Sequence, residues 1–267
     1  MDIQRKRIPL ALSLSVLLLW LGCKYSKDFP LEKTVMKFPT GNASFDEIGF
    51  LANDSTDGDV LSLTSITLSG SSIYLLDQAH SNIKLIDVNS RKILKVSSSI
   101  SPAQGYLTDL VFADGKIYVA GYQNIIFVLD TDLNIIENFK IDHPYGEKQF
   151  FRHNDQLYVN TKSTDYWQDK KFRTFAVGTN LTKDRLTLEH DTIFVGDGYE
   201  AYEVLMRGFE LAEDRGETCI GYAGHSFCIS GKIPKVPFSV RNITIENGRV
   251  AYFSFLENND VELVLYQ

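Results

Sequence analysis

Residues 113–119 read Ala-Asp-Gly-Lys-Ile-Tyr-Val, a tight turn followed by an apolar and aromatic run. The same pattern occurs at residues 69–75 (Ser-Gly-Ser-Ser-Ile-Tyr-Leu) and at residues 153–159 (His-Asn-Asp-Gln-Leu-Tyr-Val). Fainter copies occupy residues 189–195 and 246–252. Asp-Gly and Asn-Gly supply the positive φ angles that a two-residue hairpin turn requires. Each copy therefore predicts a turn between two β-strands.

The aromatic residue of this pattern gives the length of a repeat. Tyr74, Tyr118, Tyr158 and Phe194 are separated by 44, 40 and 36 positions, and a longer interval of 57 positions leads to Ala251. Short β-rich runs bounded by Gly, Asn, Asp and Ser fill these intervals, and no long stretch has helical periodicity. Repeats of this length that hold four short strands are typical of β-propeller blades.

The first two repeats contain all four strands of a blade. The sequence predicts strands at Thr64–Leu68, Ser72–Asp77, Ile83–Asp87 and Ile93–Ser97, then at Asp109–Phe112, Lys116–Ala120, Ile125–Asp130 and Ile135–Phe139. Five turns predict an all-β chain folded as a single β-propeller with about five four-stranded blades. Six blades are the alternative, if Phe45–Asn53 and the long interval before Ala251 hold a degraded repeat. The last blade has about three strands of its own, so we expect the N-terminal segment Thr34–Phe38 to complete it and remove an open edge.

These repeats also resemble a known group of propellers. Asn82-Ile83-Lys84-Leu85-Ile86-Asp87 matches the run from Asn124 to Asp130, and both units resemble blades of the NHL and YVTN-like families, which several bacterial lipoproteins carry. The resemblance covers Leu63–Ile141 and weakens after Lys162. It implies an architecture and says little about activity. The Gly-His and Trp-Asp pairs of WD40 repeats are absent.

The first 23 residues are typical of an export signal. A basic head contains Arg5, Lys6 and Arg7, and the apolar run Ile8–Leu21 is shorter than the roughly 20 residues that favour a spanning helix. Gly22-Cys23 resembles the lipobox of bacterial lipoproteins, although Trp20 and Leu21 depart from the Leu and the small residue that the family prefers. An ordinary secretory signal or an uncleaved anchor are the alternatives.

The lipobox resemblance implies the domain boundaries and the location. Residues 1–22 would be a signal peptide, residues 23–33 a lipidated tether that begins at the acylated Cys23, and residues 34–267 the propeller. Two or more acyl chains hold a protein firmly on a membrane. Lys24 after the cysteine, in place of Asp, implies delivery to the outer membrane of the cell envelope, on its periplasmic or its surface face.

Composition excludes several classes of protein. The formal net charge is −7 and no basic patch remains once the signal is removed, which argues against nucleic-acid binding. Cys219 and Cys228 are the only cysteines besides Cys23, so a four-cysteine metal site is excluded. A hairpin centred on Ala223-Gly224 would place the two directly opposite each other. This favours a disulfide in an oxidising compartment over two buried free thiols.

Aromatic residues in the predicted loops are the candidates for recognition. In a propeller the loops that join strands 2 and 3 and those that join consecutive blades share one face. We expect this face to carry Tyr122, Tyr145, Tyr166, Trp167 and Tyr199 as tentative ligand-binding residues, with polar neighbours His80, Asn82, Gln123, His143, Asp165 and Asp197. The alternative is that these rings simply cap the blades.

Neither a metal nor a cofactor is expected. Asn53–Val60 resembles part of a calcium loop, but Thr64 stands where a bidentate Glu would be needed, which favours a plain solvated turn. None of the five histidines has metal-ligand spacing, and no Gly-x-Ser-x-Gly nucleophile motif occurs.

These features predict a membrane-anchored lipoprotein outside the cytoplasm whose propeller is a binding or scaffolding module for a protein or a glycan. The residues favour binding over catalysis. The alternative is a propeller-type hydrolase or lyase acting at the central channel, which a ring of acidic residues converging on a metal would favour. A purely structural envelope protein is a third hypothesis.

Overall fold

The described part of the chain is built of β-strands and turns. No helix occurs in it, so no helix there could cross a membrane. Residues 1–31, which include the predicted signal segment, Cys23 and most of the predicted tether, lie outside it. The computed structural model describes residues 32–44, 47–52, 60–100, 106–121, 123–145, 148–153, 156–161, 173–176, 185–186, 210–214, 217–222, 225–230, 232–234, 236 and 241–267.

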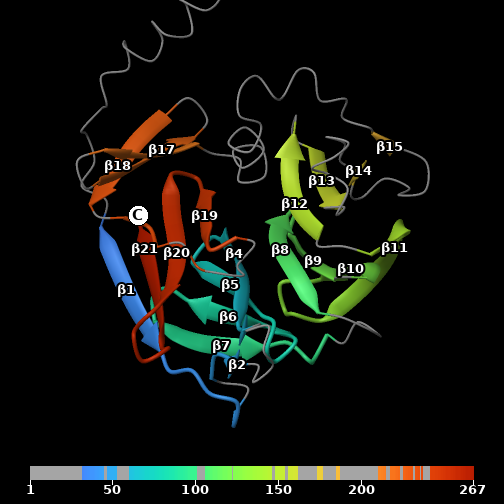
Figure 1. Ribbon diagram of the computed structural model, residues 1–267, viewed down its shortest axis with the longest axis horizontal. Coiled ribbons are helices and arrows are strands. Elements are labelled where there is room, and N and C mark those ends of the chain that lie inside the picture. The colour runs from blue at the N-terminus through green and yellow to red at the C-terminus, as the bar shows by residue number, and fades with distance from the viewer. Residues whose placement is uncertain are drawn as a thin grey trace, which may run out of the picture. The chain divides into compact units, whose positions relative to one another are not determined.

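Three sheets have four antiparallel strands in chain order, as propeller blades do (Figure 1). Blade 1 consists of β4 (Leu63–Ser69), β5 (Ser72–Asp77), β6 (Asn82–Asp87) and β7 (Lys92–Val96). Blade 2 consists of β8 (Leu107–Ala113), β9 (Lys116–Gly121), β10 (Gln123–Leu129) and β11 (Ile135–Tyr145). Blade 3 consists of β12 (Lys148–His153), β13 (Gln156–Thr161), β14 (Arg173–Ala176) and β15 (Arg185–Leu186).

A fourth four-stranded sheet joins the two ends of the propeller segment. In this closing blade, β19 (Ile243–Glu246), β20 (Arg249–Phe255) and β21 (Val261–Tyr266) are completed by β1 (Lys33–Phe38). β1 pairs antiparallel with β21, with Lys33 opposite Tyr266 and Phe38 opposite Val261. Figure 1 shows the two strands side by side. The N-terminal strand thus completes this sheet, as the sequence predicts.

The hairpin turns have the backbone that the repeat predicts. Asp114 and Gly115 have φ angles of 52° and 75°, and Asn247 and Gly248 have 50° and 76°. Gly70 has 54°. Such left-handed angles are tolerated by Gly and Asn and twist a two-residue turn to match the flanking strands. The short Gly-containing patterns therefore fix where the first and second strands of these blades meet.

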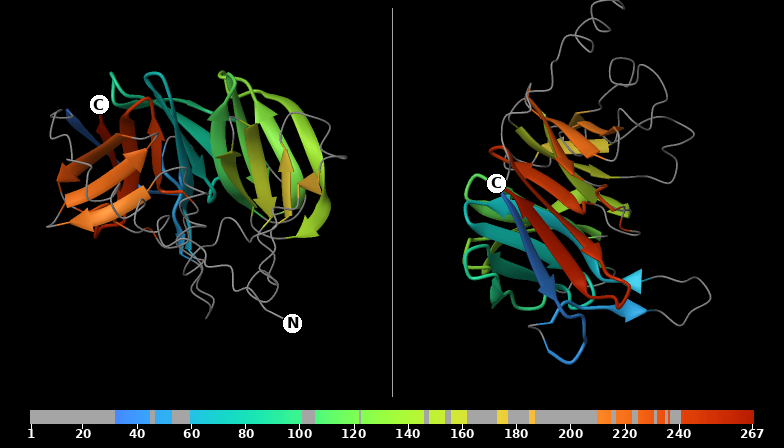
Figure 2. Two further views of the ribbon diagram at one scale, coloured as in Figure 1. Left: turned by 90° about the horizontal axis from the view of Figure 1, so that it is seen from above. Right: turned by 90° about the vertical axis from the view of Figure 1, so that its left-hand side faces the viewer.

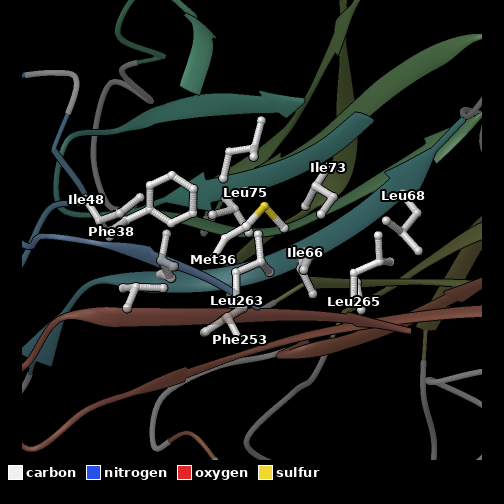
Figure 3. Packing of buried hydrophobic residues seen from close by; sticks show 14 of the residues in the cluster. Met36, Phe38, Ile48, Ile66, Leu68, Ile73, Leu75, Phe253, Leu263 and Leu265 are labelled. Carbon is white, nitrogen blue, oxygen red and sulfur yellow. The ribbon is translucent and has the colours of Figure 1, made fainter. Parts of the chain in front are cut away.

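Blade strands are buried on both faces, which explains their nearly continuous apolar sequence. Along β5, Ile73 and Leu75 pack toward the closing blade, in a cluster with Met36 and Leu263 (Figure 3). The alternate residues of β5 pack toward blade 2, in a cluster with Leu110 and Val119. Blades 2 and 3 share a third cluster. Because side chains alternate between the two faces of a strand, blades 1 and 2 each pack against two neighbouring blades.

The chain divides into two compact units, of which residues 31–210 and 233–267 hold the four blades above. The other unit contains Leu211–Lys232 and most of a three-stranded sheet: β16 (Glu210–Asp214), β17 (Glu217–Tyr222) and β18 (His225–Ser230). The described residues thus hold four four-stranded sheets in the larger unit, and the three-stranded sheet is described by itself.

Of the two segments proposed to hold a sixth, degraded repeat, Phe45–Asn53 lies in the connection from the closing blade to blade 1. The described residues of this connection form the two-stranded ribbon of β2 (Leu51–Ala52) and β3 (Val60–Leu61) and no full sheet. The other segment, the long interval before Ala251, contains β16, β17 and β18. Ile48, earlier in this connection, makes an isolated bridge with Thr40. The calcium-like residues 53–59 and the fourth copy of the repeat, 189–195, lie outside the described residues.

The cysteine hairpin has the register expected from the sequence. Tyr222 pairs with His225 and Cys219 with Cys228, so the turn is centred on positions 223–224. The two sulfur atoms are bonded at 1.99 Å.

Thiol labelling of the non-reduced, denatured protein should therefore leave Cys219 and Cys228 unmodified, and prior reduction should expose both. The measurement is peptide mass mapping after alkylation. Two labelled cysteines without reduction would contradict the bond.

Candidate functional site

Polar residues stand at the start of every innermost strand of the four blades. The pairs are Thr64-Ser65 on β4, Thr108-Asp109 on β8, Lys148-Gln149 on β12, and Arg241-Asn242 just before β19. Innermost strands of neighbouring blades contact one another, β19 with β4, β4 with β8, and β8 with β12. The pairs therefore meet around the propeller axis. We call Thr64, Ser65, Thr108, Asp109, Lys148 and Arg241 the axial cluster.

Asp109 is the centre of the axial cluster and is fully buried. Its Oδ1 accepts hydrogen bonds from the Ser65 hydroxyl of blade 1 (2.5 Å) and from the Leu110 N–H (2.9 Å). Its Oδ2 accepts the Phe150 N–H of blade 3 at 2.8 Å. A buried carboxylate is costly unless it is hydrogen-bonded and paired with a cation, and both conditions are met here.

The cation is Arg241, which approaches from the closing blade. Its Nε and Nη2 donate to Oδ1 and Oδ2 of Asp109 at 3.3 and 3.1 Å, and Nη2 also donates to the Phe150 carbonyl. The Arg241 side chain is only 12% exposed. Its backbone is bound to blade 1, donating to the Thr64 carbonyl and accepting from the Ile66 N–H, both at 3.0 Å. One ion pair thus joins all four blades at the axis.

Lys148 is a second buried cation of the axial cluster. Its side chain has no exposed surface, and its carbonyl accepts the Thr108 hydroxyl at 3.0 Å. Burial lowers the pKa of its ammonium group from 10.5 to about 8, because the charged form loses its hydration.

Stability should therefore rise with pH from about 8 toward 10.5 through this group, because the unfolded chain binds the Lys148 proton more tightly than the folded chain does. We expect the wild type to gain free energy of unfolding relative to Lys148→Met over this range, as measured by urea unfolding at a series of pH values. A constant difference between the two proteins would contradict a destabilising buried charge. The exposed Lys92 in blade 1 supplies the control variant Lys92→Met, which removes a lysine without removing a buried charge.

A second polar cluster lies where β5 and β6 of blade 1 are joined. The fully buried carboxylate of Asp77 contacts the Lys84 Nζ at 3.3 Å and the His80 Nδ1 at 3.1 Å. The Gly49 N–H donates to it at 2.8 Å. A Cβ at Gly49 would lie 2.6 Å from the Asp77 Oδ1, so glycine is needed for this approach. The cluster fastens the connection after β1 onto blade 1.

Two of the polar loop residues expected to face outward are enclosed. His80 is 11% exposed on its side chain and contacts Asp77. Asn82 is fully buried, and its amide nitrogen and oxygen have no hydrogen-bond partner within the described structure. These two residues are thus part of the blade and do not present a recognition surface.

The positions of the aromatic candidates are known only from the strands that flank them in the sequence. Tyr145 is the last residue of β11 and its backbone pairs with Gln123, while its side chain lies outside the description. Tyr122, Tyr166, Trp167 and Tyr199 lie outside the described residues, as does Cys23. β9 ends and β10 begins on either side of Tyr122, and β13 and β14 flank the segment of Tyr166 and Trp167. These segments therefore join strands 2 and 3 of blades 2 and 3, as the sequence predicts.

Sequence reasoning missed the axial cluster and the Asp77–Lys84 pair. The available signal was the recurrence of two adjacent polar residues, such as Thr64-Ser65 and Thr108-Asp109, 44 positions apart at the start of otherwise apolar strands. Within the axial cluster Asp109 is the single carboxylate, and it is paired with Arg241. Glu217, Cys219 and Cys228 have ligand atoms within 4.8 Å of one another, but both sulfur atoms belong to the disulfide.

Comparison with known proteins adds only distant structural likeness. No family model matches the chain. No curated protein matches it. Among solved structures, the chain resembles the computationally designed Ika4 protein, with 13% identity, a TM-score of 0.34, and 67% of this chain and 96% of that chain covered.

Two natural proteins are similarly distant. The Pan2 WD40 domain of Neurospora crassa has 11% identity, a TM-score of 0.35, and 76% and 63% coverage of this chain and of that one. BamB from Moraxella catarrhalis has 15% identity, a TM-score of 0.31, and 74% and 68% coverage. The assignment of the propeller fold therefore rests on the sheets, their strand order and their register, and not on these likenesses.

Proposed function

We propose that this protein is a lipid-anchored component of the cell envelope whose propeller binds a protein or a glycan. Binding would take place at the mouth end, which we define as the end of the blades where the innermost strands begin and where β5 connects to β6 and β9 to β10. The opposite end, with the turns at Gly70, Asp114-Gly115 and Asn247-Gly248, is the hairpin end.

The observation that carries this proposal is the coincidence of two features at the mouth end. The axial cluster fixes the ends of four innermost strands through the Asp109–Arg241 pair and its hydrogen bonds. The connections with Tyr122, Tyr166 and Trp167 leave the blades at this same end. Rigid strands that hold variable aromatic loops are the usual construction of a binding surface, because the loops can change without disturbing the scaffold.

The same cluster supports binding over catalysis. Asp109 is saturated by three neutral donors and the Arg241 guanidinium, and Lys148 is completely covered. A hydrolase or lyase at the axis would need an acid, a base or a metal-binding carboxylate that can reach its substrate. Within the described part of the axis, the charged groups are instead engaged in joining the blades.

Support for the anchor comes from the sequence and from the cysteine hairpin. The export signal ends in Gly22-Cys23, and the first strand begins ten positions after Cys23. The Cys219–Cys228 disulfide suits an oxidising compartment outside the cytoplasm.

Partner binding is tested by capture from detergent-solubilised cell envelopes with the full-length protein. Tyr166→Ala combined with Trp167→Ala should reduce the recovery of the partner with little change in melting temperature. Leu94→Ala combined with Ile136→Ala is the matched control, because these exposed apolar residues lie on the outer strands β7 and β11. Equal recovery with both double variants, or a large melting loss with the first, would overturn the assignment of these rings to recognition.

The anchor is tested separately by Cys23→Ser. We expect loss of acyl labelling and release of the protein from membranes. Membrane retention without an acyl label would refute lipid anchoring.

A further inference from the structure

We infer that, in the anchored protein, the hairpin end of the propeller faces the lipid surface and the mouth end faces away from it. This inference rests on the proposed lipid anchor. It concerns which surface of the fold a membrane can reach, and it follows from the position at which the chain enters the closing blade.

The tether enters the fold at the hairpin end. Glu32 and Gln267 exchange two backbone hydrogen bonds, of 2.8 and 3.2 Å, just before β1 begins. Tyr266, opposite Lys33, is also paired with Val250, which follows the Asn247-Gly248 turn directly. Figure 2 shows the start of β1 beside the C-terminus in its right-hand view. The first described residues therefore lie next to a hairpin turn.

β1 then runs the height of the closing blade toward the mouth end. Its last residue, Phe38, is opposite Val261. The connection that follows reaches Asp77 through the Gly49 N–H, and Asp77 is the last residue of β5 at the mouth end. The tether and the mouth end are thus separated by the full length of a six-residue strand, or about 20 Å.

The average span of the tether is somewhat smaller than that height. Nine positions separate Cys23 from Glu32, and a flexible chain of that length spans about 16 Å on average and about 30 Å when fully extended. To place the mouth end on the membrane, the tether would have to run back along the whole of β1, stretched beyond its average span to about two-thirds of its full length. Such stretching costs conformational entropy, and placing the hairpin end on the membrane does not require it.

The charged residues at the hairpin end do not favour an orientation different from the one that the tether favours. Lys33, Lys116 and Arg249 lie there together with Asp114 and Glu246, and Arg249 is paired with Glu246. A mixed surface of this kind has no strong attraction for anionic lipid headgroups. The attachment point of the lipid anchor therefore decides the orientation.

Two exposed serines of blade 1 allow a matched test. Ser71 lies in the turn between β4 and β5 at the hairpin end, and Ser99 follows β7 at the mouth end, next to Ile100, whose N–H binds the Ser81 carbonyl. Ser71→Cys and Ser99→Cys would each be labelled with a fluorophore in acylated, non-reduced protein. The proteins are then bound to phosphatidylcholine vesicles that contain a headgroup-linked quencher.

Quenching should be several-fold stronger at position 71 than at position 99. Equal quenching, or stronger quenching at position 99, would overturn the orientation while leaving the anchor intact. Protein that stays in the supernatant would instead refute the proposed anchor, and the orientation with it. A flexible Gly-Ser insertion of 20 residues after Lys24 should reduce the contrast between the two positions; an unchanged contrast would show that the tether length does not set it.

Discussion

Asp109→Asn should lower the free energy of unfolding by about 3–5 kcal/mol, the usual cost of removing one partner of a buried ion pair. The substitution leaves the guanidinium of Arg241 without a counter-charge in a nearly covered position. The substitution also places an amide NH₂ group opposite a hydrogen-bond donor. In the wild type this donor, the Ser65 hydroxyl or the Phe150 N–H, points at a carboxylate oxygen. The measurement is urea unfolding, and a parallel fall in melting temperature of roughly 2–4 °C per kcal/mol is expected for a chain of this size.

The matched control is Asp114→Asn in an exposed turn, which should change stability by less than about 0.5 kcal/mol. Asp114 has a φ angle of 52°, which asparagine tolerates. Arg241→Met should be nearly as costly as Asp109→Asn, and the double variant should lose less than the sum of the two because the residues act as one unit. Strict additivity, or a loss below about 1 kcal/mol for Asp109→Asn, would show that this pair does not hold the blades together.

Met36→Asp should disrupt the closing blade, with a loss of about 4–5 kcal/mol or more, since it places an unpaired charge in an apolar cluster. Met36 is 3% exposed and packs with Leu263 and Phe253 (Figure 3). Without β1, the outer edge of β21 would be left as an unpaired strand that favours aggregation. Thermal unfolding combined with light scattering measures both effects.

Val35→Asp is the control for this substitution. The residue is adjacent on the same strand but points outward and is 36% exposed, so the same charge should cost less than about 1 kcal/mol. Similar losses of unfolding free energy for both variants would mean that β1 can pack with either of its two faces toward the core. The pairing of β1 with β21 would then not depend on its register.

The local features of the fold could be predicted from the sequence because each depends on a few adjacent residues. Gly and Asn residues with positive φ mark the turns, and a short apolar run between two such turns favours a β-strand. β5 therefore matches its expected bounds, Ser72–Asp77, and β1 begins only one residue earlier than expected. The cysteine register followed from the distance of each residue to the centre of one short loop.

Contacts between distant segments could not be predicted in this way. Asp109 and Arg241 are 132 positions apart, and their pairing depends on how the blades are arranged around the axis. Lys84 lies on β6 at a position where the alternation of the strand predicts an apolar side chain. Its ion pair with Asp77, at the end of the adjacent strand β5, explains its burial. The aromatic loop residues, by contrast, were proposed from loop position alone, and their assignment to recognition remains a proposal that the Tyr166 and Trp167 variants test.

The pairing of β1 with β21 makes the completion of this blade depend on a strand that lies more than 200 positions after β1. Lys33 and its partner Tyr266 are 233 positions apart, so this pairing has a high contact order and is expected to form late. Until Val261–Tyr266 pair with it, β1 has no partner strand, and Met36 and Phe38 stay uncovered. A fragment that stops before Val261 cannot cover these two side chains, so it stays open to proteolysis.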